Sequence, residues 1–294
     1  MKALFEFFKT NWAYFQMVLG AVSLALLTAG ALSRKVLAIT LNTMREELRK
    51  KVLYFLVLFA VVFIAFSGAA AKVQPGREGE AVAQAALFVV GLFGMLVTIF
   101  SATAVLFSEI RSRTIFVLFS HPVWSFHIIM GKFLGVTAIV FISVFLMGAV
   151  LVAYLAFTPW LALVGTLIPA MALIFFQLML LTAMCVLGST FLSRITNILL
   201  SMVLFFVGSG HSFFKGVTDL MKVAVVKYYI QVFLFLLPDF EKFAVRSKMF
   251  DPDFPFDATY VLSAMGDAVF RAAVMVALGI FFFRLKEVGT ERWE

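Results

Sequence analysis

The sequence predicts an all-α, polytopic integral membrane protein. Hydrophobic residues make up 63% of the 294 residues and charged residues only 14%, which leaves too few polar side chains to cover a soluble surface. The apolar runs are continuous rather than alternating, and Phe occurs 37 times. Such runs favour membrane-spanning helices over an outer-membrane barrel, because a helix satisfies its own backbone hydrogen bonds in a bilayer.

Seven apolar runs are candidate spans. The first lies in an N-terminal anchor helix (residues 1–35), for which a signal-like anchor or an interfacial segment are the alternatives. The other six form a membrane core over residues 52–288, followed by a cytoplasmic tail at residues 289–294. A shorter run at residues 228–237 predicts a re-entrant or interfacial segment. The candidate spans are residues 12–32, 52–71, 81–107, 133–157, 161–192, 195–210 and 261–283.

Residues 36–51 predict an amphipathic elbow helix at the inner membrane face. Leu37, Leu41, Met44, Leu48 and Val52 recur at helical spacing, and Asn42, Arg45, Glu46, Arg49 and Lys50 lie on the other side. This helix is either a surface anchor or a docking site, with Arg45, Glu46 and Arg49 as docking candidates. Residues 212–227 predict a second amphipathic helix, at the outer interface, within an extracytoplasmic loop at residues 211–258.

The charges predict an orientation. The segments expected inside carry 13 Lys and Arg against six Asp and Glu, and those expected outside carry eight of each. This asymmetry follows the positive-inside rule, so the net charge of +8 reflects topology and is no sign of a nucleic-acid partner. The inner segments are residues 33–51, 108–132, 193–194 and 284–294, and the outer segments are residues 72–80 and 211–258.

Residues 108–132 form the most informative segment, a polar interruption between two long apolar runs. It contains a charged turn (Glu109, Arg111 and Arg113), a helix-breaking His121–Pro122 step, and a Gly131–Lys132 pair before the next span. Such a segment predicts a docking elbow for a soluble partner at the membrane face.

The residues give no sign of catalysis. No P-loop motif is present, and no Ser, His and acid set has a defensible spacing. The three histidines, His121, His127 and His211, lack the spacing of metal ligands, and Cys185 is best interpreted as a small core residue. We therefore expect no catalytic residue, cofactor or metal site in this chain, and a conduit rather than an enzyme.

One charged pair lies inside a predicted span. Asp267 and Arg271 are one helical turn apart, and twelve residues separate Arg271 from Arg284. Those twelve cover about 18 Å of a hydrocarbon core of about 30 Å. The simpler interpretation is an ion pair just inside the outer headgroups, and the functional one places the pair on a translocation pathway.

Several segments carry a resemblance to a known family. LAITLNTMREELRKKVLYFLVLFAVV looks like an elbow helix entering the first conserved span, and SEIRSRTIFVLFSHPVWSFHIIMGKFLG matches an acid, a basic–Thr pair, a Ser–basic–Pro step and a Gly–Lys pair. LFLLPDFEKFAVRSKM and FFFRLKEV match the outer Leu–Pro segment and the basic exit. Over roughly residues 36–288, the chain resembles the permease subunits of type-2 ATP-binding-cassette (ABC) exporters. The matched positions are Glu109, Arg113, Thr114, Ser120, His121, Pro122, Gly131 and Lys132.

The resemblance implies a six-span export permease in a bacterial or archaeal cytoplasmic membrane. It would pair with a second copy or a homologous permease, and rest on a separate cytoplasmic ATPase that holds ATP and Mg. Membrane lipids and periplasmic or accessory subunits are further partners. The chain departs from the family pattern where Trp124, Ser125 and Phe126 stand in place of a usual Arg, and where His121 replaces a Lys or Arg.

Two other classes stay open. A secondary transporter driven by an ion gradient should have midplane carboxylates and inverted repeats, and a membrane scaffold or assembly factor needs neither. The cargo is open too, because polar residues in the spans suit amphiphiles but serve ordinary helix packing equally well, and packing is favoured. Those residues are Thr98, Ser101, Thr103, Gln177, Thr182 and Ser201.

Overall fold

The computed structural model describes residues 33–69, 76–112, 125–220, 238–245, 248–250 and 256–290, and these residues form helices and turns without a strand. The predicted runs at residues 12–32 and 228–237 lie outside this part of the chain. Short 3₁₀ turns occur at Leu161–Leu163, Phe240–Lys242 and Lys248–Phe250. The helices are α2 (Arg34–Leu48), α3 (Lys51–Phe66), α4 (Glu78–Ser112), α6 (Ser125–Ala156), α7 (Val164–Ser189), α8 (Arg194–Ser209), α9 (His211–Leu220) and α11 (Ala258–Thr290).

Four of these helices are long and apolar enough to cross a membrane: α4, α6, α7 with its preceding 3₁₀ turn, and α11. The helices α3 and α8 have 16 residues each, which cover about 24 Å against a hydrocarbon core of about 30 Å. The apolar part of α3 reaches a span's length only when joined to α2 across a bend of 65°. The described residues therefore contain four candidate spans, or five with the bent pair, and the six-span core is not confirmed.

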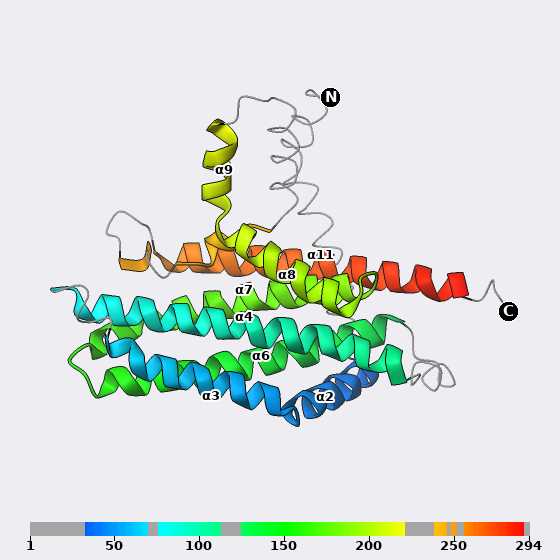
Figure 1. The fold of residues 1–294 in the computed structure, drawn as a ribbon, viewed down its shortest axis with the longest axis horizontal. Coiled ribbons are helices and arrows are strands. Elements are labelled where there is room, and N and C mark those ends of the chain that lie inside the picture. Colours follow the sequence, from blue (N-terminus) through cyan, green and yellow to red (C-terminus); the bar gives the residue numbers. More distant parts are fainter. Residues whose placement is uncertain are drawn as a thin grey trace.

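The long helices lie side by side along the longest axis of the molecule, with α7 at the centre (Figure 1). Helix α7 packs against α4, α6, α8 and α11, while α2 and α3 pack mainly on α6 and α4. The end of α4 and the C-terminal end of α11 lie at one end of the bundle, and the start of α4 lies at the other (Figure 1). Helix α9 leaves α8 at a steep angle to the bundle.

Two helix boundaries differ from the prediction. Helix α4 continues to Ser112, five residues beyond the predicted end of the span at 107, and α6 begins at Ser125, eight residues before the predicted start at 133. Residues 128–133 of α6 are buried against neighbouring helices. This packing stabilises a helix in the second part of the segment at residues 108–132, which was predicted to interrupt the apolar runs. The ends of the predicted docking segment are thus helical, and its middle, residues 113–124, lies outside the described residues.

The outward surface of the bundle is apolar. Large side chains such as Phe55 on α3, Phe145 on α6 and Phe281 on α11 are each more than half exposed. A soluble protein rarely exposes so many aromatic rings together. The pattern fits helices that face lipid, and several apolar helices indicate a membrane-embedded, multi-pass protein.

Candidate functional site

Helix α2 lies in a groove formed by two glycines at the start of α6. A Cβ atom on Gly131 would come within 2.7 Å of the Ile39 Cβ, and one on Gly135 within 2.7 Å of the Thr43 Cβ. The Thr40 hydroxyl also donates a hydrogen bond to the Gly131 carbonyl at 3.2 Å. Glycines four residues apart let two helix backbones approach closely, as in membrane helix pairs. Gly131, predicted to dock a partner, therefore supports the seating of α2 within the chain.

The polar face of α2 carries the other predicted docking residues. Arg45 and Arg49 are exposed, and Glu46 lies 3.7 Å from the Lys50 ammonium. The Ser33 hydroxyl caps the start of the helix by accepting from the Val36 amide at 3.2 Å. This face is open to a partner, and its use for docking stays a prediction.

Lys132 joins the first turns of α6 to the last part of α4. Its side chain is 1% exposed, and its ammonium donates to the Val105 carbonyl at 3.0 Å. Glu109 and Arg111 lie on the final turns of α4. The remaining docking candidates, Arg113, Thr114, Ser120, His121 and Pro122, lie outside the described residues. Lys132 thus lies in the interior, where it links the two helices that enter the docking segment.

The intramembrane pair is present and has a second cation. Arg271 Nε donates to Asp267 Oδ1 at 2.9 Å, and Lys242 Nζ lies 3.5 Å from Asp267 Oδ2. The Tyr260 hydroxyl donates to the Lys242 carbonyl at 2.6 Å, which holds this backbone against α11. Asp267 therefore connects its own helix to the 3₁₀ turn Phe240–Lys242. No spacing in the sequence identifies Lys242 as a partner, because it lies 25 residues before Asp267.

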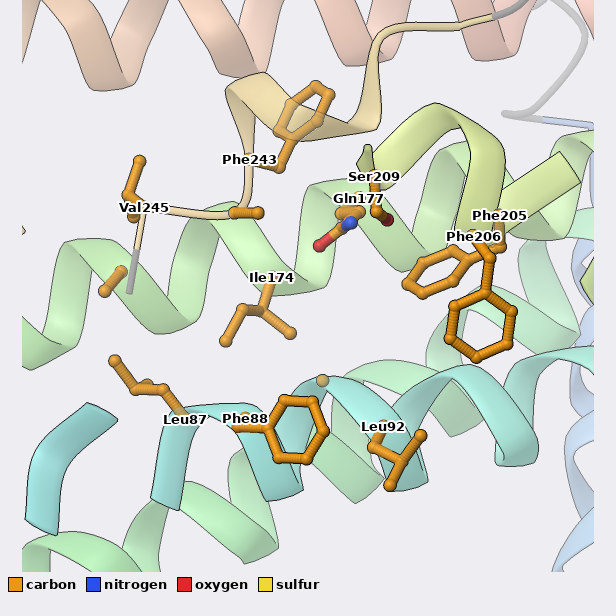
Figure 2. A pocket seen from close by; sticks show the side chains of 13 residues that line it. Leu87, Phe88, Leu92, Ile174, Gln177, Phe205, Phe206, Ser209, Phe243 and Val245 are labelled. Atoms are coloured by element: carbon orange, nitrogen blue, oxygen red, sulfur yellow. The ribbon is translucent and has the colours of Figure 1, made fainter. Parts of the chain in front are cut away.

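A cavity of about 120 Å³ lies between α4, α7, α8 and the segment after the 3₁₀ turn at residue 240. Figure 2 shows Gln177 and Ser209 at this cavity among aromatic side chains, including Phe88, Phe205 and Phe243. The Gln177 amide makes a long bond of 3.5 Å to the Phe240 carbonyl, and the Ser209 hydroxyl has no hydrogen-bond partner among the described residues. An apolar cavity with two polar groups can hold part of an amphiphile.

Most of the predicted pathway hydroxyls bond within the protein. Thr98 and Thr182 donate to carbonyls four residues earlier in their own helices, at 2.8 and 2.9 Å. Such bonds satisfy a buried hydroxyl without a ligand. Thr98 and Thr182 therefore have the hydrogen bonds expected of residues that serve helix packing. Of the six polar residues predicted as pathway candidates, only Gln177 lines the cavity in Figure 2.

A buried polar network that was not predicted from the sequence surrounds Asn197. Its amide nitrogen donates to the Cys185 carbonyl at 3.0 Å and to the Ser189 hydroxyl at 2.8 Å, and lies 3.5 Å from the Thr103 hydroxyl. The network joins α8 to α7 and α4. A single Asn inside the apolar run at residues 195–210 was the signal that could have identified it.

Within the described residues, no group of three His, Cys, Asp or Glu side chains is arranged to hold a metal ion. The chain matches no protein-family model and no curated protein sequence. Fold and site together define a class: a helical, multi-pass membrane protein with an apolar cavity between its helices and a separate helix, α2, that meets α3 at a bend.

Proposed function

We propose that the chain is the membrane-spanning permease subunit of an ABC exporter, working as a dimer with a separate ATPase in a bacterial or archaeal cytoplasmic membrane. The observation that supports the proposal is the packing of α2 on α6 and of α6 on α4, the two helices that lead into residues 113–124. Helix α2 is seated in the Gly131–Gly135 groove, and Lys132 ties α6 to α4.

This arrangement suits the transmission of force. A chain without its own nucleotide site must receive conformational work through a contact with a partner. Residues 113–124 connect α4 to α6, and both helices are fixed to each other at their adjoining ends. A partner that moved this segment would displace the two helices together, with α2 carried along by close packing, which resists deformation.

The secondary-transporter alternative receives no support from the intramembrane carboxylate. Asp267 is already shared between Arg271 and Lys242. A coupling-ion site needs an acid that binds and releases its ion, and two neighbouring cations compete with that ion. Whether the chain is a permease or a scaffold is decided by whether an ABC ATPase co-purifies with it.

The test is purification of the complex from its native membrane, with identification of the accompanying chains by mass spectrometry. An ABC ATPase should co-purify with the unaltered chain. Arg113→Glu combined with Pro122→Gly should remove the ATPase and leave membrane insertion intact. Arg77→Glu, at the opposite end of α4 and with a side chain 70% exposed, is the matched control and should retain it.

The two parts of the proposal fail differently. Absence of any ATPase from the complex of the unaltered chain would refute the permease assignment and favour a scaffold. Retention of the ATPase with full coupling of ATP turnover in the double variant would refute only the docking site.

A further inference from the structure

A second, smaller cavity of about 100 Å³ lies at the bend between α2 and α3, next to α4 and the start of α8. Its lining divides into two chemical parts. Glu47, Lys50, Ser101 and Arg194 are polar, and the remaining residues, among them Leu53 and Phe100, are apolar. No predicted docking or pathway role accounts for this combination of an acid, two cations and an apolar wall.

Glu47 is the unusual residue of this cavity. Its side chain is 1% exposed. One carboxylate oxygen, Oε1, pairs with the Lys50 ammonium, while Oε2 has no hydrogen-bond partner among the described residues, although the Ser101 hydroxyl lies near the group. A buried carboxylate oxygen without a donor is costly. The cavity therefore presents an acceptor that a ligand's N–H group would satisfy.

Arg194 supplies the opposite charge at the rim. It is the first residue of α8 and is exposed, and it forms no ion pair with a carboxylate of the described residues. The ammonium of Lys50, by contrast, is already engaged by Glu47 and lies near Glu46. A guanidinium group binds phosphate through two parallel hydrogen bonds. The cavity thus offers a buried acceptor and, at its mouth, a phosphate donor.

The cavity lies at the level where lipid headgroups are expected. Helix α2 is amphipathic, and α3 is apolar after its first residue, Lys51, with outward-facing residues such as Phe55 and Phe59 more than half exposed. The change from polar to apolar residues occurs after Lys50 and Lys51, where α2 ends and α3 begins. Phe100 is 42% exposed on the apolar side of the cavity, so an acyl chain can leave along the outer surface of the bundle.

We propose that this cavity binds a membrane phospholipid whose headgroup combines a primary ammonium with a phosphate, of the phosphatidylethanolamine class. The ammonium donates to Glu47 Oε2, and the phosphate accepts from Arg194. A choline headgroup has no N–H to donate, and a glycerol headgroup has no cation. The site therefore distinguishes these lipids by hydrogen bonding as well as by charge. This inference does not depend on the permease assignment.

The test is lipid retention by the purified full chain. The protein is delipidated, exposed to phosphatidylethanolamine, phosphatidylcholine or phosphatidylglycerol with identical acyl chains, and analysed by native mass spectrometry. We expect phosphatidylethanolamine to be retained about tenfold more tightly than the other two. Glu47→Gln should remove most of that preference. Arg194→Gln should weaken the retention of all three lipids alike, because each carries the same phosphate. Arg34→Gln, an exposed change at the first residue of α2, is the control and should leave the lipid preference unchanged.

Several results would overturn the proposal. Equal retention of the three lipids by the unaltered protein does so even where Glu47→Gln fails to fold. An unchanged preference in a folded Glu47→Gln protein removes the ammonium contact. Soluble glycerophosphoethanolamine serves as a competitor, and displacement of the lipid at equal concentration would show that the site takes a free headgroup and not a membrane lipid.

Discussion

The close packing of α2 on α6 predicts the effect of one added methyl group. In Gly135→Ala, the new Cβ would lie 2.7 Å from the Thr43 Cβ and 3.0 Å from the Thr40 carbonyl oxygen. Carbon atoms in ordinary contact are about 3.5–4.0 Å apart, so the shortfall is about 1 Å. Both opposing atoms are fixed to the α2 backbone, and no change of side-chain rotamer relieves the clash. Helix α2 must move away from α6.

The cost follows from this displacement. Overpacking of a close interface costs about 1–3 kcal/mol, and separation of the helices also weakens the bond between Thr40 and the Gly131 carbonyl, worth about 1 kcal/mol. Alanine in place of glycine within a helix returns about 1 kcal/mol. We expect a net loss of about 1–3 kcal/mol in the free energy of unfolding. Gly131→Ala should behave similarly, because its Cβ would also lie 2.7 Å from a Cβ atom of α2.

The assay is equilibrium unfolding in detergent micelles, with Gly266→Ala on α11 as the control. A Cβ at Gly266 has no neighbour within 4 Å, so this variant should be neutral or stabilised by up to about 1 kcal/mol. The double variant at Gly131 and Gly135 should cost less than the sum of the two, since one movement of α2 relieves both clashes. Equal effects of Gly135→Ala and Gly266→Ala would refute the reasoning.

Two further predictions concern buried polar groups. Asp267→Ala leaves Arg271 and Lys242 without their shared carboxylate. It should therefore destabilise the protein more than the double change Asp267→Ala with Arg271→Ala does. We expect a coupling of about 0.5–1 kcal/mol between Asp267 and Arg271, because the side chains of these two residues are about a quarter exposed. Strict additivity in that thermal-unfolding cycle would show that the charges do not interact. Asn197→Ala should cost about 1–3 kcal/mol, because it removes the hydrogen bonds that the Asn197 amide donates to the Cys185 carbonyl and the Ser189 hydroxyl. The exposed change Asn42→Ala should stay within about 0.5 kcal/mol, and similar losses for both variants in denaturant melts would contradict a structural network.

The sequence predicted well what depends on local pattern. A separate helix is found near residues 36–51, and Asp267 pairs with Arg271, because a helical period and a spacing of four residues are visible in one dimension. The six-span count is not confirmed. Helix α8 agrees within one residue at each end with the predicted run at residues 195–210, but its 16 residues are fewer than a typical span needs.

The sites that were missed depend on contacts between distant segments. Lys132 has the appearance of a membrane-surface residue, yet its ammonium reaches a carbonyl 27 residues earlier in the chain. Glu47 belongs to the α2 segment of the amphipathic pattern, yet its side chain is buried at the bend between α2 and α3, next to α4. No periodicity in one dimension distinguishes a charge that faces solvent from one that an approaching helix covers.

The two ends of the bundle are held by different forces. At the end where α6 begins, α2 is held on α6 by close contacts at Gly131 and Gly135, which added salt does not screen. Toward the other end, the 3₁₀ turn Phe240–Lys242 is held to α11 partly by the ion pair of Lys242 with Asp267, and these charges are partly exposed and open to screening. Breaking that pair costs little, whereas separating α2 from α6 forfeits a packed interface. A force applied to residues 113–124 would therefore move α2, α4 and α6 as a unit. The first contacts to break would be those between the 3₁₀ turn Phe240–Lys242 and α11.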